Sequence, residues 1–535
     1  MAGMNLDLSN LPDDARLSKH DIASLIGLVE QKYQEKIHYL EERIRLLQNE
    51  LFGRKSEKRY PEDHLQLPIF QATQADESID DEQGQDTIVI AEHNRIKRGR
   101  KPLPEDLPRV EIIHDLAEEE KVCPCGATLC RIGEDTCEKL DYVPAKVRVL
   151  RHIRYKYACK SCEGVEDDGP TVKIAPAPAA LIPKSNATEG LLAHIVVSKF
   201  ADGLPLYRQE KIFSRIGVDL PRATMANWLI QVARCCSPLI GLLQNEIRIG
   251  PLINMDESPL QVLKEPGRAN TTKSYMWVFC GGNPEHPTVL FEYHPSRSGE
   301  VALKFLDEYQ GHIQSDDYSG YDYLGKKKAI VHLGCWAHVR RKFFDVVKVR
   351  KKNRGKGDNP KGLADLSLEY IGELYRIEKQ IRLDQLTPEQ IYQRRQEQSK
   401  PILDQFKEWL DATEPLTPPK GLLGIAIKYA LKNWDKLIVY ISNGLLRPDN
   451  NVAENAIRPF VVGRKNWLFA GHPNGASASA TFFSLIETAK ANGLEPYAYL
   501  RCLFGQLPFV KDQAGYRALL PQYIDPDLIN RSNQI

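Results

Sequence analysis

The hydrophobic pattern at the start of the chain has the spacing of a coiled coil. From about Ile26 to Leu51, apolar residues recur mostly in alternating steps of four and three, with one interruption between Tyr33 and Ile37. This spacing predicts a leucine-zipper-like dimerisation helix over residues 20–55. A single amphipathic helix packed on its own domain has a similar pattern, but no apolar partner follows nearby in the sequence.

Residues 56–115 lose this periodicity and are polar and proline-bearing, which predicts a linker. Within the linker, Arg98, Arg100 and Lys101 form a short basic arm around a glycine, and Pro102 follows. An extended arm of this kind is thin enough to enter an A·T-rich minor groove of DNA. The alternative is a solvated charge run that merely aids solubility.

Residues 185–245 have helical periodicity. Three amphipathic segments are expected as helices, at 190–200, 206–216 and 222–232. A glycine turn and Pro221 separate the last two, as in a helix-turn-helix motif, and Thr224, Asn227 and Trp228 lie on the helix that would read the DNA. A three-helix packing unit without DNA contact is the alternative.

From Leu252 onward the pattern becomes that of strands. Strands are expected at 252–255, 274–280 and 288–293, a helix at 300–309, two further strands at 313–314 and 329–333, and a helix at 337–348. This is the order of an RNase H-like mixed sheet, whose first and fourth strands are neighbours. We therefore expect an RNase H-like catalytic core over residues 250–472, with a helical insertion at about 349–445 and a C-terminal helical segment over 475–535.

The size and charge of the chain fit this multidomain α/β organisation. A chain of 535 residues is too long for one hydrophobic core. Although the net charge is only +1, basic residues cluster at 95–101 and 340–361, and these clusters would attract a polyanion. No apolar run approaches the length of a membrane span, and residues 1–10 lack a secretory hydrophobic region. We therefore expect a cytoplasmic, nucleoid-associated protein without membrane contact.

In a reducing compartment the 11 cysteines are thiols or metal ligands rather than disulfides. Two close pairs stand out: Cys123 with Cys125, and Cys159 with Cys162. Together they predict one tetrahedral structural Zn²⁺ site in a small segment over residues 116–175, with strands between the pairs at 143–157. The first pair is tighter than usual, so Cys130 or Cys137 could replace one ligand. A pair of reduced hairpins without metal is the alternative.

Three carboxylates suggest a second kind of metal site. Asp256 is expected at the end of the first core strand and Asp316 at the end of the fourth, so the two should converge. Glu454, on a helix with Arg458 one turn later, would complete the site from the side. Carboxylates suit Mg²⁺ or Mn²⁺, and two such ions about 3.5–4 Å apart support in-line phosphoryl transfer on a nucleic acid. Taken singly, each acidic residue is more simply a turn or cap residue.

Neighbouring residues leave part of this assignment open. Consecutive side chains of a strand point to opposite faces, so only one of Asp256 and Glu257, and one of Asp316 and Asp317, should reach the metal ions. Cys335 and His338 are too few for a local metal site, and we expect them to orient or pack.

Basic residues close to these carboxylates are expected to contact DNA. The candidates are Arg340, Arg341, Arg458, Arg464 and Lys465, with Trp467 as the aromatic partner. The basic side chains would clamp phosphates, and Trp467 would stack on an unpaired base. For Trp467 a place in the hydrophobic core is an equal alternative.

Several ordered motifs carry a family resemblance. They include the segments 51–58, 98–104, 199–210, 316–321, 335–338 and 463–469. In these motifs, and almost from end to end, the chain resembles the large transposase subunit of the insertion-sequence-sixty-six family of bacterial mobile elements. The resemblance implies a DDE transposase with an RNase H-like core, a zinc-binding segment and small accessory proteins of the same element.

The resemblance also assigns residues. Asp256, Asp316 and Glu454 match the family's acidic triad, and the four paired cysteines match its zinc segment. This chain has Ser258 where threonine often follows the Asp-Glu pair, and Asn455 where arginine is common. Asp317 stands where a small residue is usual, which leaves open which of the two aspartates binds metal.

Together these observations predict a transposase that binds the terminal inverted repeats of its element and target DNA. It would act as a homodimer or higher oligomer and would cleave and join strands with two metal ions. A DNA-binding repressor or architectural protein whose core has lost activity is the principal alternative. A general RNase H-like nuclease is a third, but so much sequence devoted to DNA binding argues against it.

Overall fold

The computed structural model of the protein describes residues 147–158, 172–316, 318–321, 329–353 and 361–533, with scattered residues of a helix between 27 and 47. The basic arm (Arg98, Arg100 and Lys101) and the four paired cysteines lie outside the described residues. So does most of the predicted coiled coil, whose described residues are helical. The chain divides into two compact units: residues 1–71 together with 178–535, and residues 72–177.

In the unit of residues 72–177, two short strands pair as an antiparallel hairpin. They are β1 (Lys156–Ala158) and β2 (Val172–Ile174), with Lys156 opposite Ile174. The strand predicted at 143–157 is wrong for residues 147–155, which have no regular secondary structure. The apolar side chains there, such as Val149 and Ile153, are exposed, so their alternation does not mark a buried sheet face.

In the unit of residues 1–71 and 178–535, four helices directly precede the sheet, and the sequence predicts three of them. These are α2 (Glu189–Phe200), α3 (Leu206–Arg215), α4 (Arg222–Cys235) and α5 (Ser237–Ile249). Thr188 caps α2 by accepting from the Leu191 N–H, and Gly217 adopts a positive φ of 80° in the turn before α4. Their buried faces belong to the same hydrophobic core as the sheet that follows.

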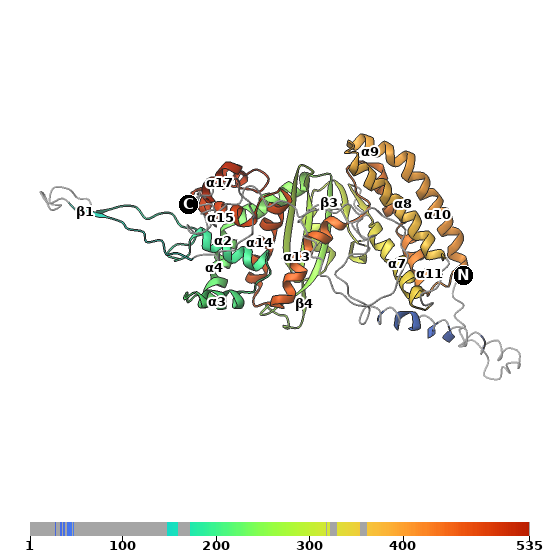
Figure 1. The fold of residues 1–535 in the computed structure, drawn as a ribbon, viewed down its shortest axis with the longest axis horizontal. Coiled ribbons are helices and arrows are strands. Elements are labelled where there is room, and N and C mark those ends of the chain that lie inside the picture. The colour runs from blue at the N-terminus through green and yellow to red at the C-terminus, as the bar shows by residue number, and fades with distance from the viewer. Residues whose placement is uncertain are drawn as a thin grey trace, which may run out of the picture. The chain divides into compact units, whose positions relative to one another are not determined.

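The sheet has the strand neighbours predicted from the sequence (Figure 1). Its elements are β3 (Leu252–Val262), β4 (Lys273–Asn283), β5 (His286–His294), α6 (Gly299–Phe305), β6 (Gly311–Gln314), β7 (Ile330–Leu333) and α7 (Trp336–Asn353). The strand order is β5-β4-β3-β6-β7, with β3 antiparallel to β4 and parallel to β6. The first and fourth strands of the core are therefore neighbours, as predicted.

One prediction about the first strand is wrong. Asp256 does not end β3, because pairing with β4 continues to Gln261 opposite Lys273. What ends near Asp256 is the parallel pairing with β6, whose last partners are Asn254 and Gln314. Asp256 thus lies in mid-strand, just past the point where β3 loses its neighbour on one side.

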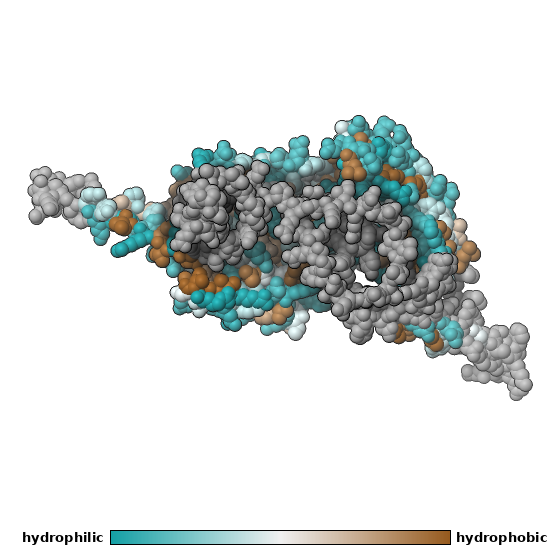
Figure 2. Space-filling model, in the orientation of Figure 1, coloured by the Kyte–Doolittle hydropathy of each residue, from teal (hydrophilic) through white to brown (hydrophobic). Residues whose placement is uncertain are grey.

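The helical insertion between α7 and α13 has a hydrophobic core of its own. Its elements are α8 (Leu363–Leu383), α9 (Pro388–Arg394), the π-helical η6 (Arg395–Ser399), α10 (Lys400–Thr413), η7 (Glu414–Leu416), α11 (Leu422–Lys432), α12 (Trp434–Leu437) and η8 (Val439–Ser442). Large side chains such as Phe343, Phe406 and Trp434 fill this core. The outer surface over these helices is mostly hydrophilic (Figure 2).

The remaining helices close the sheet. They are α13 (Asn451–Trp467), α14 (Pro473–Ala491), α15 (Pro496–Gln506), η9 (Leu507–Phe509), α16 (Gln513–Ala518) and α17 (Pro526–Asn533), with the short strand β8 (Phe469–Ala470) beside the far end of β3. The Ser484 and Thr488 hydroxyls accept from the Phe291 and Val289 N–H groups of the edge strand β5. Helix α14 therefore covers a strand edge that would otherwise be open.

Within the described residues, no single helix has both the length and the apolar composition that a membrane span needs. The pair α4 and α5, bent by 54° between the two helices, reaches that length and composition together.

Candidate metal-binding active site

A buried network of three amide side chains joins β3, β6 and the start of α13. The Asn254 Nδ2 group donates to Gln314 Oε1 at 2.9 Å and to Asn450 Oδ1 at 3.0 Å. Asn450 Nδ2 in turn donates to the Met255 carbonyl at 2.9 Å. Because unpaired buried amides are costly, this network fixes the relative positions of the three elements.

The network lies directly beside the three predicted metal ligands. Asn254 is opposite Gln314 in the parallel register, and two residues further along each strand come Asp256 and Asp316. Asn450 caps α13, and Glu454 follows in the first turn of that helix. The structure therefore brings together the elements that carry the three carboxylates, although 196 residues separate Asn254 from Asn450.

The charges of the three carboxylates act on one another. The pKa of Asp256 is raised to about 7, chiefly by burial and then by the negative charges of Glu257, Asp316 and Glu454. Asp256 Oδ1 accepts one hydrogen bond, from the Glu257 N–H at 2.8 Å. Such an acidic cluster is costly without cations, and clusters of this kind are typical of functional sites.

Glu454 has an oxygen free for a metal ion. Its Oε1 atom is buried and has no hydrogen-bond partner among the residues that the structure describes. The nearest cationic or ring nitrogens, His338 Nδ1 and Arg341 Nη2, are each 3.8 Å from a Glu454 oxygen, and burial lowers the pKa of His338. An orphaned carboxylate oxygen beside two further carboxylates fits the oxygen preference of Mg²⁺ or Mn²⁺.

Cys335, His338 and Glu454 form a further group whose ligand atoms lie within 4.8 Å of one another. Burial raises the pKa of the Cys335 thiol to about 12, so the thiol is protonated when no cation is bound. Its Sγ atom accepts the Asn450 N–H at 3.2 Å. Cys335 therefore helps to hold the start of α13, which is the orienting role expected from the sequence.

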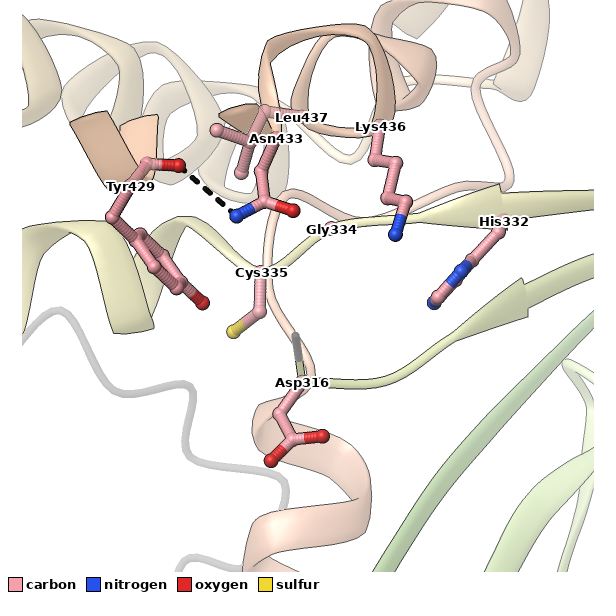
Figure 3. A pocket seen from close by; sticks show the side chains of 8 residues that line it. All are labelled: Asp316, His332, Gly334, Cys335, Tyr429, Asn433, Lys436 and Leu437. Atoms are coloured by element: carbon pink, nitrogen blue, oxygen red, sulfur yellow. Dashed lines mark hydrogen bonds between the residues drawn. The ribbon is translucent and has the colours of Figure 1, made fainter. Parts of the chain in front are cut away.

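The helical insertion reaches the site beside Asp316. Figure 3 shows a small pocket lined by Asp316, His332 and Cys335 and, from the insertion, by Tyr429, Asn433 and Lys436, with the Asp316 carboxylate pointing away from the insertion. The Lys342 Nζ atom of α7 lies 4.4 Å from the centre of the Tyr429 ring. The insertion thus supplies part of the wall of the site.

The two acidic neighbours separate as strand alternation predicts. The carboxylate of Glu257 is 2% exposed and binds Arg297 and Tyr321, away from Glu454. The negative charge of Asp316 acts on both Asp256 and Glu257, whereas that of Glu454 acts on Asp256. Asp317 lies outside the described residues.

The predicted DNA-contacting residues have different degrees of exposure. Arg341, Arg458 and Lys465 are exposed, whereas Arg340 is half-buried with its guanidinium 5.7 Å from the Phe344 ring. Arg464 is half-buried and donates to the Ser258 hydroxyl at 3.2 Å. The exposed residues around Glu454 remain the better candidates for phosphate contact.

Two aromatic candidates are packed rather than free. The ring of Trp467 contacts Phe200 and Phe483, and the Lys199 Nζ atom lies 4.2 Å from its centre. A core position for Trp467 is therefore favoured over stacking on a base. On α4, Thr224 is half-buried and Asn227 is exposed, but Trp228 is 7% exposed and faces the core.

Sequence reasoning missed Asn254, Gln314 and Asn450 as contributors to the site. A usable signal was present for the first two, because each is a polar residue within a short apolar strand, two positions before a candidate aspartate. Asn450 had no such signal, since its side chain binds β3 instead of capping its own helix.

Comparisons with known proteins identify the family of this chain. A family model described as "Transposase IS66 family" matches residues 184–478. Models for the zinc-finger binding domain of transposase IS66, the transposase C of IS166 homeodomain and the IS66 C-terminal element match residues 120–163, 39–112 and 484–522. The mixed sheet, the helices and these matches define a multidomain α/β transposase. The chain belongs to the IS66 transposase family.

Relatives of similar length also exist in Sinorhizobium fredii. The uncharacterized protein y4qI is 31% identical over 98% of this chain and 100% of its own length. The uncharacterized protein y4jD is 37% identical over 74% of this chain and 76% of its own. The uncharacterized protein y4hP is 30% identical over 86% and 84%, respectively.

Proposed function

We propose that the protein cleaves and joins DNA at the terminal inverted repeats of an insertion sequence, using an RNase H-like DDE core. The observation that carries this proposal is the amide network, which joins β3, β6 and the start of α13 next to Asp256, Asp316 and Glu454. Burial, and then the charges of Glu257, Asp316 and Glu454, raise the pKa of Asp256. The order β5-β4-β3-β6-β7, with three antiparallel strands followed by two parallel ones, supports the RNase H-like assignment.

The three carboxylates would hold two Mg²⁺ or Mn²⁺ ions. When bound, such ions activate the attacking oxygen and stabilise the leaving oxygen of a phosphodiester. Asp256 must give up its proton to become a ligand, and its raised pKa means that this proton is still partly present near pH 7. The amide network keeps the ligand-bearing elements in register, and the exposed Arg341 beside Glu454 is placed to contact a phosphate of the strand being cut.

Other parts of the chain would select the DNA. Arg98, Arg100 and Lys101, together with Thr224 and Asn227, are our candidates for contacts with the repeat ends. Cys123, Cys125, Cys159 and Cys162 would hold one structural Zn²⁺, which the zinc-finger family match supports. Loss of zinc from Cys159→Ser, measured against the wild-type zinc content, tests that assignment. The coiled coil would pair protomers, with small accessory proteins of the element completing the complex.

The test of the function is excision and joining of the element in cells that also express its accessory proteins. Asp316→Asn and Glu454→Gln each remove one charge at nearly constant shape. Both should abolish joining while binding to the repeat ends is retained. Glu408→Gln, at an exposed position on α10, is the matched control and should keep full activity. Joining by either site variant would exclude this set of ligands, and failure of the wild type would favour a DNA-binding repressor.

A further inference from the structure

Glu257 is a buried carboxylate that neighbours a metal ligand but has a separate set of partners. Its side chain is 2% exposed, and it accepts hydrogen bonds from Arg297 Nε and from the Tyr321 hydroxyl. A carboxylate withdrawn this far from water needs donors of this kind to offset the cost of its burial.

These partners come from two different segments around β3. Arg297 lies in the loop that leads into α6, and Tyr321 ends the short 3-10 helix η4 (Ser319–Tyr321). Tyr321 is fully buried, with its ring edge-on to Trp277, the residue opposite Glu257 on β4. Glu257 therefore ties β3 and β4 to both of these loops.

The same contacts lead directly to Asp316. The guanidinium carbon of Arg297 lies 3.6 Å from the centre of the Tyr318 ring, which is itself edge-on to Tyr321. The Tyr318 N–H donates to Asp316 Oδ1 at 3.1 Å. Bonds from Glu257 thus fix Arg297 and Tyr321, these two residues fix Tyr318, and Tyr318 orients the carboxylate of Asp316.

The glycine of this loop adds an independent sign of close packing. A Cβ atom at position 320 would collide with the ring of Tyr318. The tyrosine ring therefore lies directly against the backbone at Gly320.

We propose that Glu257 is a positioning residue that sets the orientation of Asp316 for metal binding. This inference rests on the proposed function only in taking Asp316 as a metal ligand. A glutamine at 257 offers one acceptor in place of two and turns an N–H₂ group toward one of the two donors. The loop then loses one of its two anchors, and Asp316 must be ordered by the metal itself.

Glu265, in the loop between β3 and β4, provides a matched control. Glu265 is also buried, and it also accepts from a tyrosine hydroxyl and an arginine, Tyr293 and Arg268. It follows β3, whose end at Val262 lies about 20 Å beyond Asp256 at ~3.3 Å per strand residue. Glu265→Gln therefore removes an equivalent buried charge without touching the loop of Asp316.

The experiment compares Mn²⁺ binding and Mn²⁺-dependent end cleavage in full-length wild type, Glu257→Gln, Tyr321→Phe and Glu265→Gln. Mn²⁺ binding is read directly by electron paramagnetic resonance, and cleavage is read on a duplex with the repeat end. Loss of outer contacts typically weakens a metal site by about 10–100-fold. We expect that loss for Glu257→Gln, a smaller loss for Tyr321→Phe and none for Glu265→Gln, with the cleavage rate largely recovered at saturating Mn²⁺.

Two results would overturn the proposal. Unchanged Mn²⁺ affinity in both Glu257→Gln and Tyr321→Phe would show that the contacts do not position Asp316. Loss of all Mn²⁺ binding in folded Glu257→Gln, with no recovery at high Mn²⁺, would make Glu257 a ligand itself. If Glu257→Gln fails to fold, Tyr321→Phe alone decides. Should the wild type cleave no DNA, the proposed function fails, but the comparison of Mn²⁺ affinities still tests the role of Glu257.

Discussion

The carboxylates of Asp256 and Glu257, on opposite faces of β3, have different surroundings. On one face, Asp256 lies among like charges, and Glu454 keeps an oxygen without a hydrogen-bond partner in the described structure. On the other face, burial raises the pKa of Glu257, but the bonds from Tyr321 and Arg297 oppose that shift. The first arrangement costs stability and suits cations that are yet to bind, whereas the second gives the site its geometry.

The substitution Asp256→Asn should have the largest effect, because it removes the carboxylate from one of the two faces. The substitution removes a metal ligand, so DNA cleavage should fall at least about a thousandfold, the scale of a lost electrostatic contact in a transition state. Binding of the repeat ends should persist, because the fold and the exposed basic residues are unchanged. Cleavage and end binding measured on the same preparation check this, and retained cleavage would remove Asp256 from the site.

The same variant should make the metal-free protein more stable. The folded-state pKa of Asp256 is raised from 3.8 to about 7, so this residue's contribution to stability is fully present below pH 4 and is lost as the pH rises through about 7. Asparagine mimics the protonated form and should raise the melting temperature at pH 8 by roughly 2–4 °C for each 1 kcal/mol gained.

Divalent metal sharpens this stability test. Mg²⁺ should stabilise the wild type against heat more than it stabilises Asp256→Asn, because a ligand stabilises only the state that binds it. Thermal unfolding at pH 8, with and without Mg²⁺ and with zinc kept bound, measures both effects. A less stable metal-free Asp256→Asn would argue against a strained acidic cluster.

Asn450→Ala should have an intermediate effect. It removes one of the two bonds that Asn254 Nδ2 donates and the bond to the Met255 carbonyl, at a cost of about 1–3 kcal/mol. It also frees the start of α13, and a shift of Glu454 by about 1 Å should lower cleavage roughly a hundredfold. Asn492→Ala removes comparable bonds, to the Pro287 and Thr488 carbonyls, away from the site. Asn492→Ala should lower the stability but not the cleavage activity. Equal losses of activity in both variants would show that Asn450 contributes only to folding stability.

The smallest expected effects come from a pair of glycines. Gly320→Ala forces the Tyr318 ring away from the loop and should raise the Mn²⁺ concentration needed for cleavage by several-fold. Gly372, in the middle of α8, has open space where a Cβ would lie, so Gly372→Ala should add about 0.5–1 kcal/mol of stability without changing metal dependence. Identical metal dependence in both variants would contradict a tight loop around Asp316.

The sequence predicted the order of the core strands, because β4 and β5 have long apolar runs and β6 and β7 have short ones between clear breaks. It did not predict the length of β3, since Glu257, Ser258 and Pro259 look like a turn. The structure accommodates Pro259 because β6 no longer pairs with that part of β3. Within the predicted helical insertion, π-helical turns separate α9 from α10 around Arg395, which is buried against Glu378 and three carbonyl groups.

The carboxylates of the site were predictable, but the contacts that hold them were not. Asp256, Asp316 and Glu454 stand at recognisable positions relative to strands and a helix. The bonds of Asn254 to Asn450 and of Arg297 to Glu257 join residues far apart in the chain, and local pattern contains no information about such pairs. The direction in which Glu257 points followed from alternation, but its partners did not.

The central claim is that residues 256, 316 and 454 surround one divalent metal centre. Fe²⁺ can replace Mg²⁺ at an oxygen-ligand site, and with ascorbate and peroxide it cuts the polypeptide beside the bound ion. We predict three cuts, one close to each of these residues. Excess Mg²⁺ should suppress all three cuts, and Glu454→Gln should reduce the yield of all three. Mg²⁺-sensitive cuts at only one of the three segments, or at none, would contradict the account.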